Sequence, residues 1–141
     1  MQAKLIKANN RKVPTTLMNW EIYPESIYHM LKKYSAYDKV NKIIITENGA
    51  AFNDQVIDDE VHDIHRKQFI EENITQILRA QNEGINVKGY FVWTFLDNFE
   101  WAEGYLPRFG LVHVDFKTQK RTIKHSGYWY QQFLAGENQV K

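Results

Sequence analysis

The sequence of 141 residues predicts an α/β fold, in which helices cover a sheet of parallel strands. Two apolar runs, at 43–47 and 87–95, are typical of strands. Between them, from about 59 to 82, apolar residues recur at the spacing of a one-faced helix. A strand, a helix and a strand joined by short links form a unit whose strands are almost always parallel. There is no repeat or linker, so residues 1–141 are expected to form one segment.

The first strand carries the most informative residue. Three isoleucines, at 43–45, favour a strand buried on both faces, as in parallel sheets covered by helices. The strand ends at Glu47, and we expect Asn48-Gly49 to turn the chain because both residues tolerate positive φ. A carboxylate at the carboxyl end of such a strand lies where α/β barrels place their chemistry. A glutamate that merely begins a solvated turn is the alternative, and this stretch alone leaves both open.

The first helix is predicted from about Pro24 to Tyr34. Residues 1–14 are polar and form an extended lead-in, and a loop over 18–24 delivers Pro24 to the first helical turn, where proline is favoured. Helical spacing predicts that four side chains of this helix are buried, namely Ile27, Tyr28, Leu31 and Tyr34.

The second helix, from about Asp59 to Asn82, should pack through one apolar stripe. The stripe comprises Ile70, Ile74, Ile77 and Leu78. Acidic side chains crowd the start, where they favour the helix dipole, and they are Asp58, Asp59, Glu60 and Asp63. Gly84 is expected just past the end, as a residue with positive φ.

The remainder of the chain is predicted to form a loop, a hairpin and a last helix. The loop covers 96–110, and the hairpin strands lie at 111–116 and 121–123. The helix covers about 124–134 and offers three aromatic side chains for packing, namely Tyr128, Trp129 and Phe133.

Composition restricts the function classes. The chain is 43% hydrophobic and 25% charged, as expected for one globular unit, and its formal net charge of +1 gives no electrostatic reason to expect nucleic acid or an anionic membrane. The absence of cysteine excludes disulfides, thiol catalysis and thiolate metal sites, and it favours, without fixing, a reducing cytoplasmic location. No apolar run approaches the roughly 20 residues that span a bilayer, and residues 1–10 lack the apolar segment of a secretory signal.

Aromatic and acidic residues converge at one edge of the predicted sheet. Neighbouring parallel strands end on the same side, so Glu47 can face one pocket together with Trp93, Glu100 and Trp101. An indole face beside carboxylates suits a pyranose ring, which stacks through its C–H face while its hydroxyls donate to the carboxylates. The alternative, with Trp93 in the core and Glu100 a solvated loop acid, is equally open at this point.

Several motifs decide between these alternatives by resemblance. Three segments closely resemble motifs of family 1 glycoside hydrolases, the β-glucosidases: Ile45–Gly49, Trp93–Trp101 and Arg108–Asp115. Trp20–Pro24 and Ser126–Tyr130 fit the same family in the same order. The resemblance covers nearly the whole chain after about residue 15.

The resemblance implies a role for each matched residue. It makes Glu47 the nucleophile of a retaining mechanism, which forms a covalent glycosyl–enzyme. Glu100 and Trp101 would hydrogen-bond the hydroxyls of the non-reducing sugar. Trp93 would form the platform beneath that sugar, and Phe109 would line its far side.

The resemblance also indicates a class of substrate. Trp20 would lie nearer the leaving group. The pair Glu100-Trp101 stands where the 6-phospho branch of the family carries a phosphate-accepting loop, which points to an unphosphorylated β-glucoside or a near relative. The resemblance implies neither a metal nor a cofactor.

The sequence also departs from the family. The family's acid/base belongs to an upstream Asn-Glu-Pro motif, whereas the three prolines here, Pro14, Pro24 and Pro107, follow valine, tyrosine and leucine. A (β/α)₈ TIM barrel needs about 250 residues. The expected fold is therefore the C-terminal part of such a barrel, holding its last two strands and incomplete in this chain.

Two functional hypotheses result. In the first, the chain is the nucleophile-bearing part of a β-glucosidase and is active only with the acid/base part. In the second, it is an inactive fragment with a residual sugar-binding surface. Exposed strand edges and an uncovered aromatic face predict that the segment is ordered only within a barrel completed by an N-terminal part or by a second copy.

A metal site is considered and set aside. His62 and His65 are three residues apart on the predicted helix, and the acidic residues near them are Asp58, Asp59, Glu60 and Asp63. Solvated side chains at an acidic helix start explain this pattern more simply. His113 and His125 are expected to be packing or surface residues, and the Asn73-Ile74-Thr75 sequon falls inside a helix.

Overall fold

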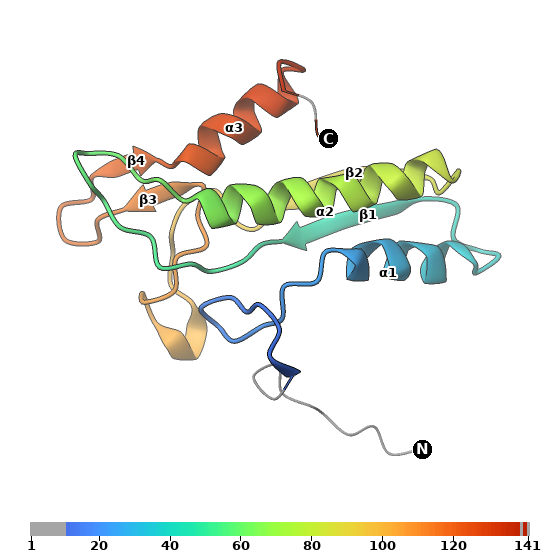
Figure 1. Ribbon diagram of the computed structural model, residues 1–141, viewed down its shortest axis with the longest axis horizontal. Coiled ribbons are helices and arrows are strands. Elements are labelled where there is room, and N and C mark those ends of the chain that lie inside the picture. The colour runs from blue at the N-terminus through green and yellow to red at the C-terminus, as the bar shows by residue number, and fades with distance from the viewer. Residues whose placement is uncertain (1–10, 139, 141) are drawn as a thin grey trace.

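The computed structural model describes residues 11–138 and 140, which form an α/β segment. In chain order its elements are α1 (Glu25–Ser35), β1 (Ile43–Asn48), α2 (Ile64–Asn82), β2 (Val87–Val92), the 3₁₀ turn η2 (Trp101–Glu103), β3 (Val112–Val114), β4 (Arg121–Ile123) and α3 (His125–Leu134). β1 and β2 pair in parallel and are connected through α2, which confirms the predicted strand–helix–strand unit. Figure 1 shows the three helices arranged along this sheet, with α2 between α1 and α3.

One face of the β1–β2 sheet packs on helices. Its register places Ile45 beside Tyr90, and both side chains, like Ile43, pack on the core beneath α1 and α2. The buried members of that core are Tyr28, Leu31, Ile77, Ala80 and Val87. A second cluster joins Ile70 and Ile74 of α2 to Leu111, with Trp129 and Phe133 of α3 packed against it.

The other face of the sheet is open. Ile44 is 48% exposed, and Phe91 and Phe95 are 60% and 69% exposed. The prediction that the isoleucine strand is buried on both faces is therefore wrong for this chain. Within the described residues the helices cover one face only, and the two parallel strands form no closed barrel.

The first helix lies close to its predicted position. α1 begins at Glu25, with Pro24 as the preceding cap residue. Tyr28 and Leu31 are buried as expected, whereas Tyr34 is 46% exposed. Instead of entering the core, the ring of Tyr34 lies 6.1 Å from the ring of Tyr37, a residue beyond the end of α1.

The second helix begins later than predicted. Asp58 and Asp59 have φ angles of 50° and 64°, which a right-handed helix excludes, so the chain turns there and α2 starts at Ile64. Asp63 is the N-cap residue of α2, but the first turn holds no acidic residue, so the dipole interpretation is wrong for Asp58, Asp59 and Glu60. At the other end Gly84 has the expected positive φ of 87°. Leu78, predicted in the buried stripe, is 39% exposed.

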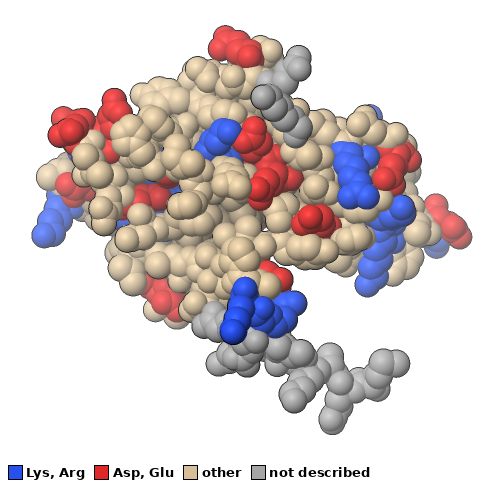
Figure 2. Space-filling view, in the orientation of Figure 1, with Lys and Arg blue, Asp and Glu red and all other residues tan. Residues whose placement is uncertain are grey.

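The C-terminal elements agree with the sequence. β3 and β4 form the expected antiparallel hairpin, with His113 opposite Thr122. In α3, Trp129 and Phe133 pack on the second cluster, but Tyr128 is 50% exposed and does not. No helix among the described residues is both long enough and apolar enough to cross a membrane. On the face seen in Figure 2, acidic and basic side chains are interspersed.

Candidate active site

A cleft of about 720 Å³ opens at the carboxyl ends of β1 and β2. Its lining residues are Trp20, Glu47, Asn48, Gly49, Trp93, Asn98, Phe99, Glu100, Trp101 and Phe109. All six site residues predicted from the sequence are in this set. The structure thus gathers side chains from the N-terminal loop, the end of β1 and the loop after β2.

The end of β1 presents Glu47 to the cleft. Glu47 is the second-last residue of the strand, and its side chain is exposed. The next residue, Asn48, is held on both sides: its backbone carbonyl accepts the Trp93 amide at 2.8 Å, and its Oδ1 accepts the Tyr90 hydroxyl at 2.8 Å. Burial raises the pKa of Tyr90, so that hydroxyl remains a donor at physiological pH.

Gly49 has a different role from the one predicted. Neither Asn48 nor Gly49 has a positive φ, so the turn interpretation is wrong. A Cβ built on Gly49 would lie 1.7 Å from the carbonyl oxygen of Trp93. Glycine is required here because two backbone segments meet without space for a side chain, and this contact sets Glu47 beside Trp93.

The loop after β2 supplies the other acidic side chain. The peptide bond Trp93–Thr94 is cis, and the loop then leads to η2. The amide of Glu100 donates to the Gly104 carbonyl at 2.7 Å, which closes a tight turn around η2. Trp101, within that turn, is 83% exposed, so its indole is available to a ligand.

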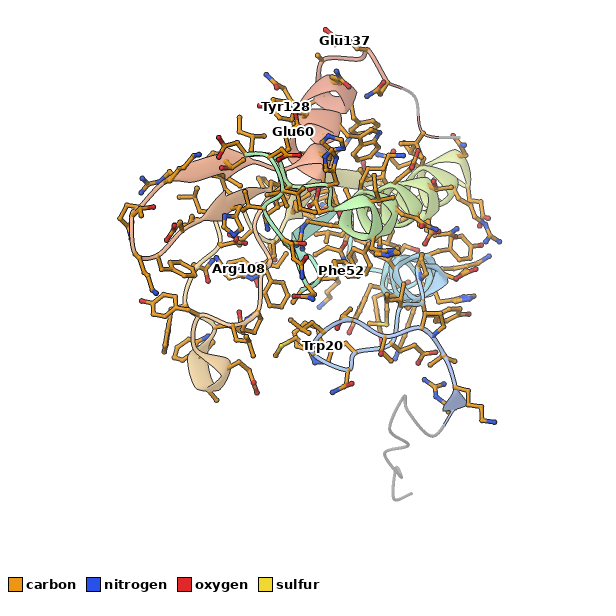
Figure 3. All side chains as sticks on the ribbon, turned by 60° about the vertical axis from the view of Figure 1, so that its left-hand side comes forward. Trp20, Phe52, Glu60, Arg108, Tyr128 and Glu137 are labelled. Carbon is orange, nitrogen blue, oxygen red and sulfur yellow. The ribbon has the colours of Figure 1, made fainter. Side chains whose placement is uncertain are left out.

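Aromatic rings form much of the remaining wall. Trp20 and Trp93 are 51% and 36% exposed, whereas Phe109 is buried. The rings of Trp20 and Phe109 lie 5.9 Å apart at 47°, which ties the N-terminal loop to the far side of the cleft. Figure 3 shows Trp20 on this loop, below Phe52 and Arg108.

Buried charges hold the cleft-forming loops. The side chains of Arg66 and Lys124 are 1% and 0% exposed, and both pair with Asp54. Arg66 also donates to the carbonyl of Ala50 at 2.5 Å, directly after Gly49. Lys124 donates to Asp97 at 2.9 Å, at the base of the loop that carries Glu100. Burial and then the Arg66 charge lower the pKa of Lys124, and the two carboxylates oppose this change.

Asp97 also contacts the far end of its own loop. Its Oδ1 accepts the Gly110 amide at 2.8 Å, and its Oδ2 lies 3.2 Å from Nη1 of Arg108. Nη1 of Arg108 also donates to the Val114 carbonyl at 2.7 Å. One buried carboxylate therefore ties the start of the loop over 97–110 to its end and to β3.

Sequence reasoning missed part of this arrangement. Asn98 and Phe99 line the cleft but were not predicted to do so, although they lie in the Trp93–Trp101 motif between predicted site residues. Arg66 was overlooked, although it stands four residues before Ile70 on the buried stripe of α2, a position that is usually apolar. Asp54 and Lys124 gave no local signal, because they lie 70 residues apart in sequence.

Metal-ligating side chains meet elsewhere. Glu60, His62 and His125 offer ligand atoms within 4.8 Å of one another, and none of the three lines the cleft. His62 precedes α2, so its predicted place on the helix with His65 is wrong, and the pairing that was set aside does not form on a helix. His125 was predicted to be a packing or surface residue, and it is exposed beside His62.

Comparison with known proteins places the cleft in a family context. The model of glycosyl hydrolase family 1 matches residues 1–139. Over 121 residues the chain is 54% identical to Beta-glucosidase A of Thermotoga maritima, a match that covers 85% of the chain and 27% of that protein. Over 126 residues it is 44% identical to a 6-phospho-beta-galactosidase of Clostridium acetobutylicum, covering 89% of the chain and 27% of that protein.

Solved structures agree with these matches. The family 1 β-glucosidase from Thermotoga maritima aligns with a TM-score of 0.89 and 50% identity, over 93% of this chain and 30% of that one. The same coverage holds for that enzyme in complex with castanospermine. The chain spans less than a third of the length of these relatives, which are TIM barrels, and this confirms the expected incomplete barrel. The chain belongs to glycosyl hydrolase family 1.

Proposed function

We propose that this chain supplies the nucleophile and part of the sugar-binding surface of a retaining β-glucosidase. In this proposal the Glu47 carboxylate attacks the anomeric carbon of a terminal non-reducing β-D-glucosyl residue. The bond to the leaving oxygen breaks as a covalent glycosyl–enzyme forms, and water then releases glucose with retained configuration. The observation that carries the proposal is that one cleft holds Glu47, Glu100 and three tryptophans.

The sugar would be held by stacking and by charge-assisted hydrogen bonds. Trp93 forms the platform beneath the ring, and Phe109 lines its far side. Glu100 accepts hydrogens from the sugar hydroxyls, and the Trp101 indole N–H donates to one of them. Trp20 contacts the leaving group. Exposure of the Trp101 and Trp20 rings supports these roles, because a ligand can reach them without a rearrangement of the core.

The acid/base comes from outside these 141 residues. A retaining mechanism needs a protonated carboxyl about 5–5.5 Å from the nucleophile, to protonate the leaving oxygen. The family's Asn-Glu-Pro segment is absent from the sequence. We therefore propose that the chain alone is inactive, and that a polypeptide with the N-terminal part of the barrel completes the site.

The proposed substrate is unphosphorylated. A phosphate group is usually held by lysine or arginine, and the described residues that line the cleft include neither. Two carboxylates, Glu47 and Glu100, would repel a phosphate on the sugar. The higher identity to β-glucosidase A than to the 6-phospho-β-galactosidase supports the same choice.

The test is reconstitution. The chain is mixed with a polypeptide that carries the N-terminal part of a family 1 barrel, and hydrolysis of p-nitrophenyl β-glucoside is measured. Activity is expected in the mixture only, and Glu47→Gln should lower it by about 10³-fold or more, because the amide cannot act as the nucleophile. A 2-fluoroglucoside, which slows breakdown of the intermediate, should leave its sugar on the peptide that contains Glu47. Glu103→Gln is the matched control, because Glu103 belongs to η2 but does not line the cleft.

Each other result has a definite meaning. Turnover by the lone chain would contradict the missing acid/base, and Glu100→Gln would be the next variant. A label on another residue would contradict the role of Glu47. If the mixture is folded but hydrolyses nothing, while glucoside still perturbs Trp93 and Trp101 in NMR spectra, the chain is an inactive sugar-binding fragment. Faster hydrolysis of a 6-phospho-glycoside would contradict the proposed substrate class.

A further inference from the structure

Two histidines from distant parts of the chain meet on the surface away from the cleft. Nδ1 of His62 lies 3.3 Å from Nδ1 of His125, and the rings meet edge to face with centroids 4.2 Å apart. On the opposite side of the His62 ring, Nε2 lies 3.2 Å from Oε2 of Glu60. Figure 3 shows Glu60 beside the start of α3, whose first residue is His125.

The backbone beneath this pair is fixed by buried hydrogen bonds. The amide of His125 donates to the Val61 carbonyl at 3.0 Å. The amide and hydroxyl of Ser126 donate to the two carboxylate oxygens of Asp63, at 2.8 and 2.5 Å. Val61, Asp63 and Ser126 are buried, so the residues on either side of His62 anchor its segment to α3 while the imidazoles point outward. The two histidines are therefore presented together by a rigid support.

The distance between the two nitrogens matches that of two ligands on one metal ion. Zn–N bonds of about 2.0–2.1 Å at the tetrahedral angle place two ligand nitrogens about 3.4 Å apart. The Glu60 carboxylate, 3.2 Å from Nε2 of His62, favours the tautomer that carries its proton on Nε2, which leaves a lone pair on Nδ1, the nitrogen nearest His125. A carboxylate on the outer nitrogen is the usual support of a metal-bound histidine.

We propose that His62 and His125 bind a divalent transition-metal cation of the zinc class through their Nδ1 atoms. Glu60 acts as the positioning residue that fixes the tautomer and orientation of His62. Water fills the remaining coordination positions, because all three side chains are exposed. The cation would join the segment before α2 to the start of α3, and this site is independent of the proposed glucosidase activity.

The test is a zinc titration, measured by calorimetry, of the metal-free chain reconstituted with the N-terminal barrel part, with no affinity tag on either polypeptide. One equivalent of zinc per chain is expected. His62→Ala and His125→Ala should each weaken binding by more than about 100-fold, and Glu60→Gln by about 10–100-fold, as found for outer-shell partners. His65→Ala is the matched control: this exposed histidine lies three residues from His62 and should leave the affinity unchanged.

A second measurement needs no variant. In ¹⁵N NMR spectra of the wild-type imidazoles, zinc should shift the Nδ1 signals of His62 and His125 and leave a proton on Nε2 of His62. Absence of zinc binding, or binding that survives in the His62→Ala/His125→Ala double variant, would overturn the proposal. An equal loss of affinity in His65→Ala, or shifts at Nε2 instead of Nδ1, would overturn the assigned ligands.

Discussion

Gly49 and Trp93 meet backbone to backbone, at a point where a single methyl group on Gly49 would lie 1.7 Å from the Trp93 carbonyl oxygen. Gly49 follows β1 and Trp93 follows β2, so this contact sets the relative position of the two strand ends. The proposed nucleophile, Glu47, and the proposed sugar platform, Trp93, can therefore lie close together only because residue 49 has no side chain.

Gly49→Ala is therefore expected to damage both stability and the cleft. The methyl group must displace a backbone carbonyl, and overpacking of this kind costs about 1–3 kcal/mol of unfolding free energy. Urea denaturation measures the cost, and the reconstituted enzyme should lose most of its glucosidase activity. Gly89→Ala is the matched control, because its Cβ would meet side-chain atoms and no backbone: Cγ2 of Ile44 at 3.1 Å and Cε2 of Phe91 at 3.5 Å, both on exposed residues. Equal effects of the two variants would contradict the contact.

Lys124→Met is expected to destabilise the fold strongly. It leaves Asp54 and Asp97 buried without the ammonium between them, and removing one member of a buried ion pair costs about 3–5 kcal/mol. The measurement is the urea midpoint of the variant relative to the wild type. Lys120→Met is the control, because its pair with Asp59 is largely exposed and should contribute little. A loss for Lys124→Met no larger than that for Lys120→Met would contradict the network.

The contact between α1 and α2 should depend on pH through Glu83. The Tyr28 hydroxyl donates to both Glu83 oxygens at 2.8 Å, and this bond, supported by Lys32, lowers the pKa of Glu83 from its ordinary value of 4.5. A carboxyl whose pKa is lower in the folded state stabilises the fold above the ordinary value, and this contribution disappears as the pH falls through the folded value.

Tyr28→Phe removes the donor and should therefore destabilise the protein more at pH 7 than at pH 3. The free energy of unfolding is measured for both proteins at each pH. Glu83→Gln provides the comparison, because it should reduce the pH dependence in the same range without removing the tyrosine. A difference between wild type and Tyr28→Phe that is the same at both pH values would contradict the assignment.

The open face of the sheet predicts association of the lone chain. Ile44, Phe91 and Phe95 present an apolar surface to solvent, and each strand of the two-stranded sheet has one unpaired edge. Sedimentation velocity should show self-association, which Phe91→Thr reduces and which the N-terminal barrel part suppresses. Tyr34→Thr removes an exposed aromatic from a helix and should change little. A compact wild-type monomer would contradict both this prediction and the expectation that the segment is ordered only in a completed barrel.

Local patterns were enough to predict the order of the elements, and the family resemblance was needed to choose the cleft residues. Apolar spacing placed Ile70, Ile74 and Ile77 correctly, and the strand ends brought Glu47 and Glu100 to one site. The errors concern features that depend on distant residues. Ile44 is exposed because nothing described here covers its face, and α2 starts late because Asp58 and Asp59 adopt positive φ in a turn. Periodicity within a helix likewise cannot pair His62 with His125.

The buried charges also constrain the order in which the chain can fold. Asp54 and Lys124 are separated by 70 residues, and Asp97 and Lys124 by 27. During synthesis Asp54 can pair with Arg66, and Asp97 with Arg108, before their shared ammonium partner emerges, so only the link between the two loops waits for α3. The loops of the proposed site can therefore lock to each other only after the last helix is made, and a nascent chain that stops before residue 124 should stay open to proteases around 50–54 and 97–110.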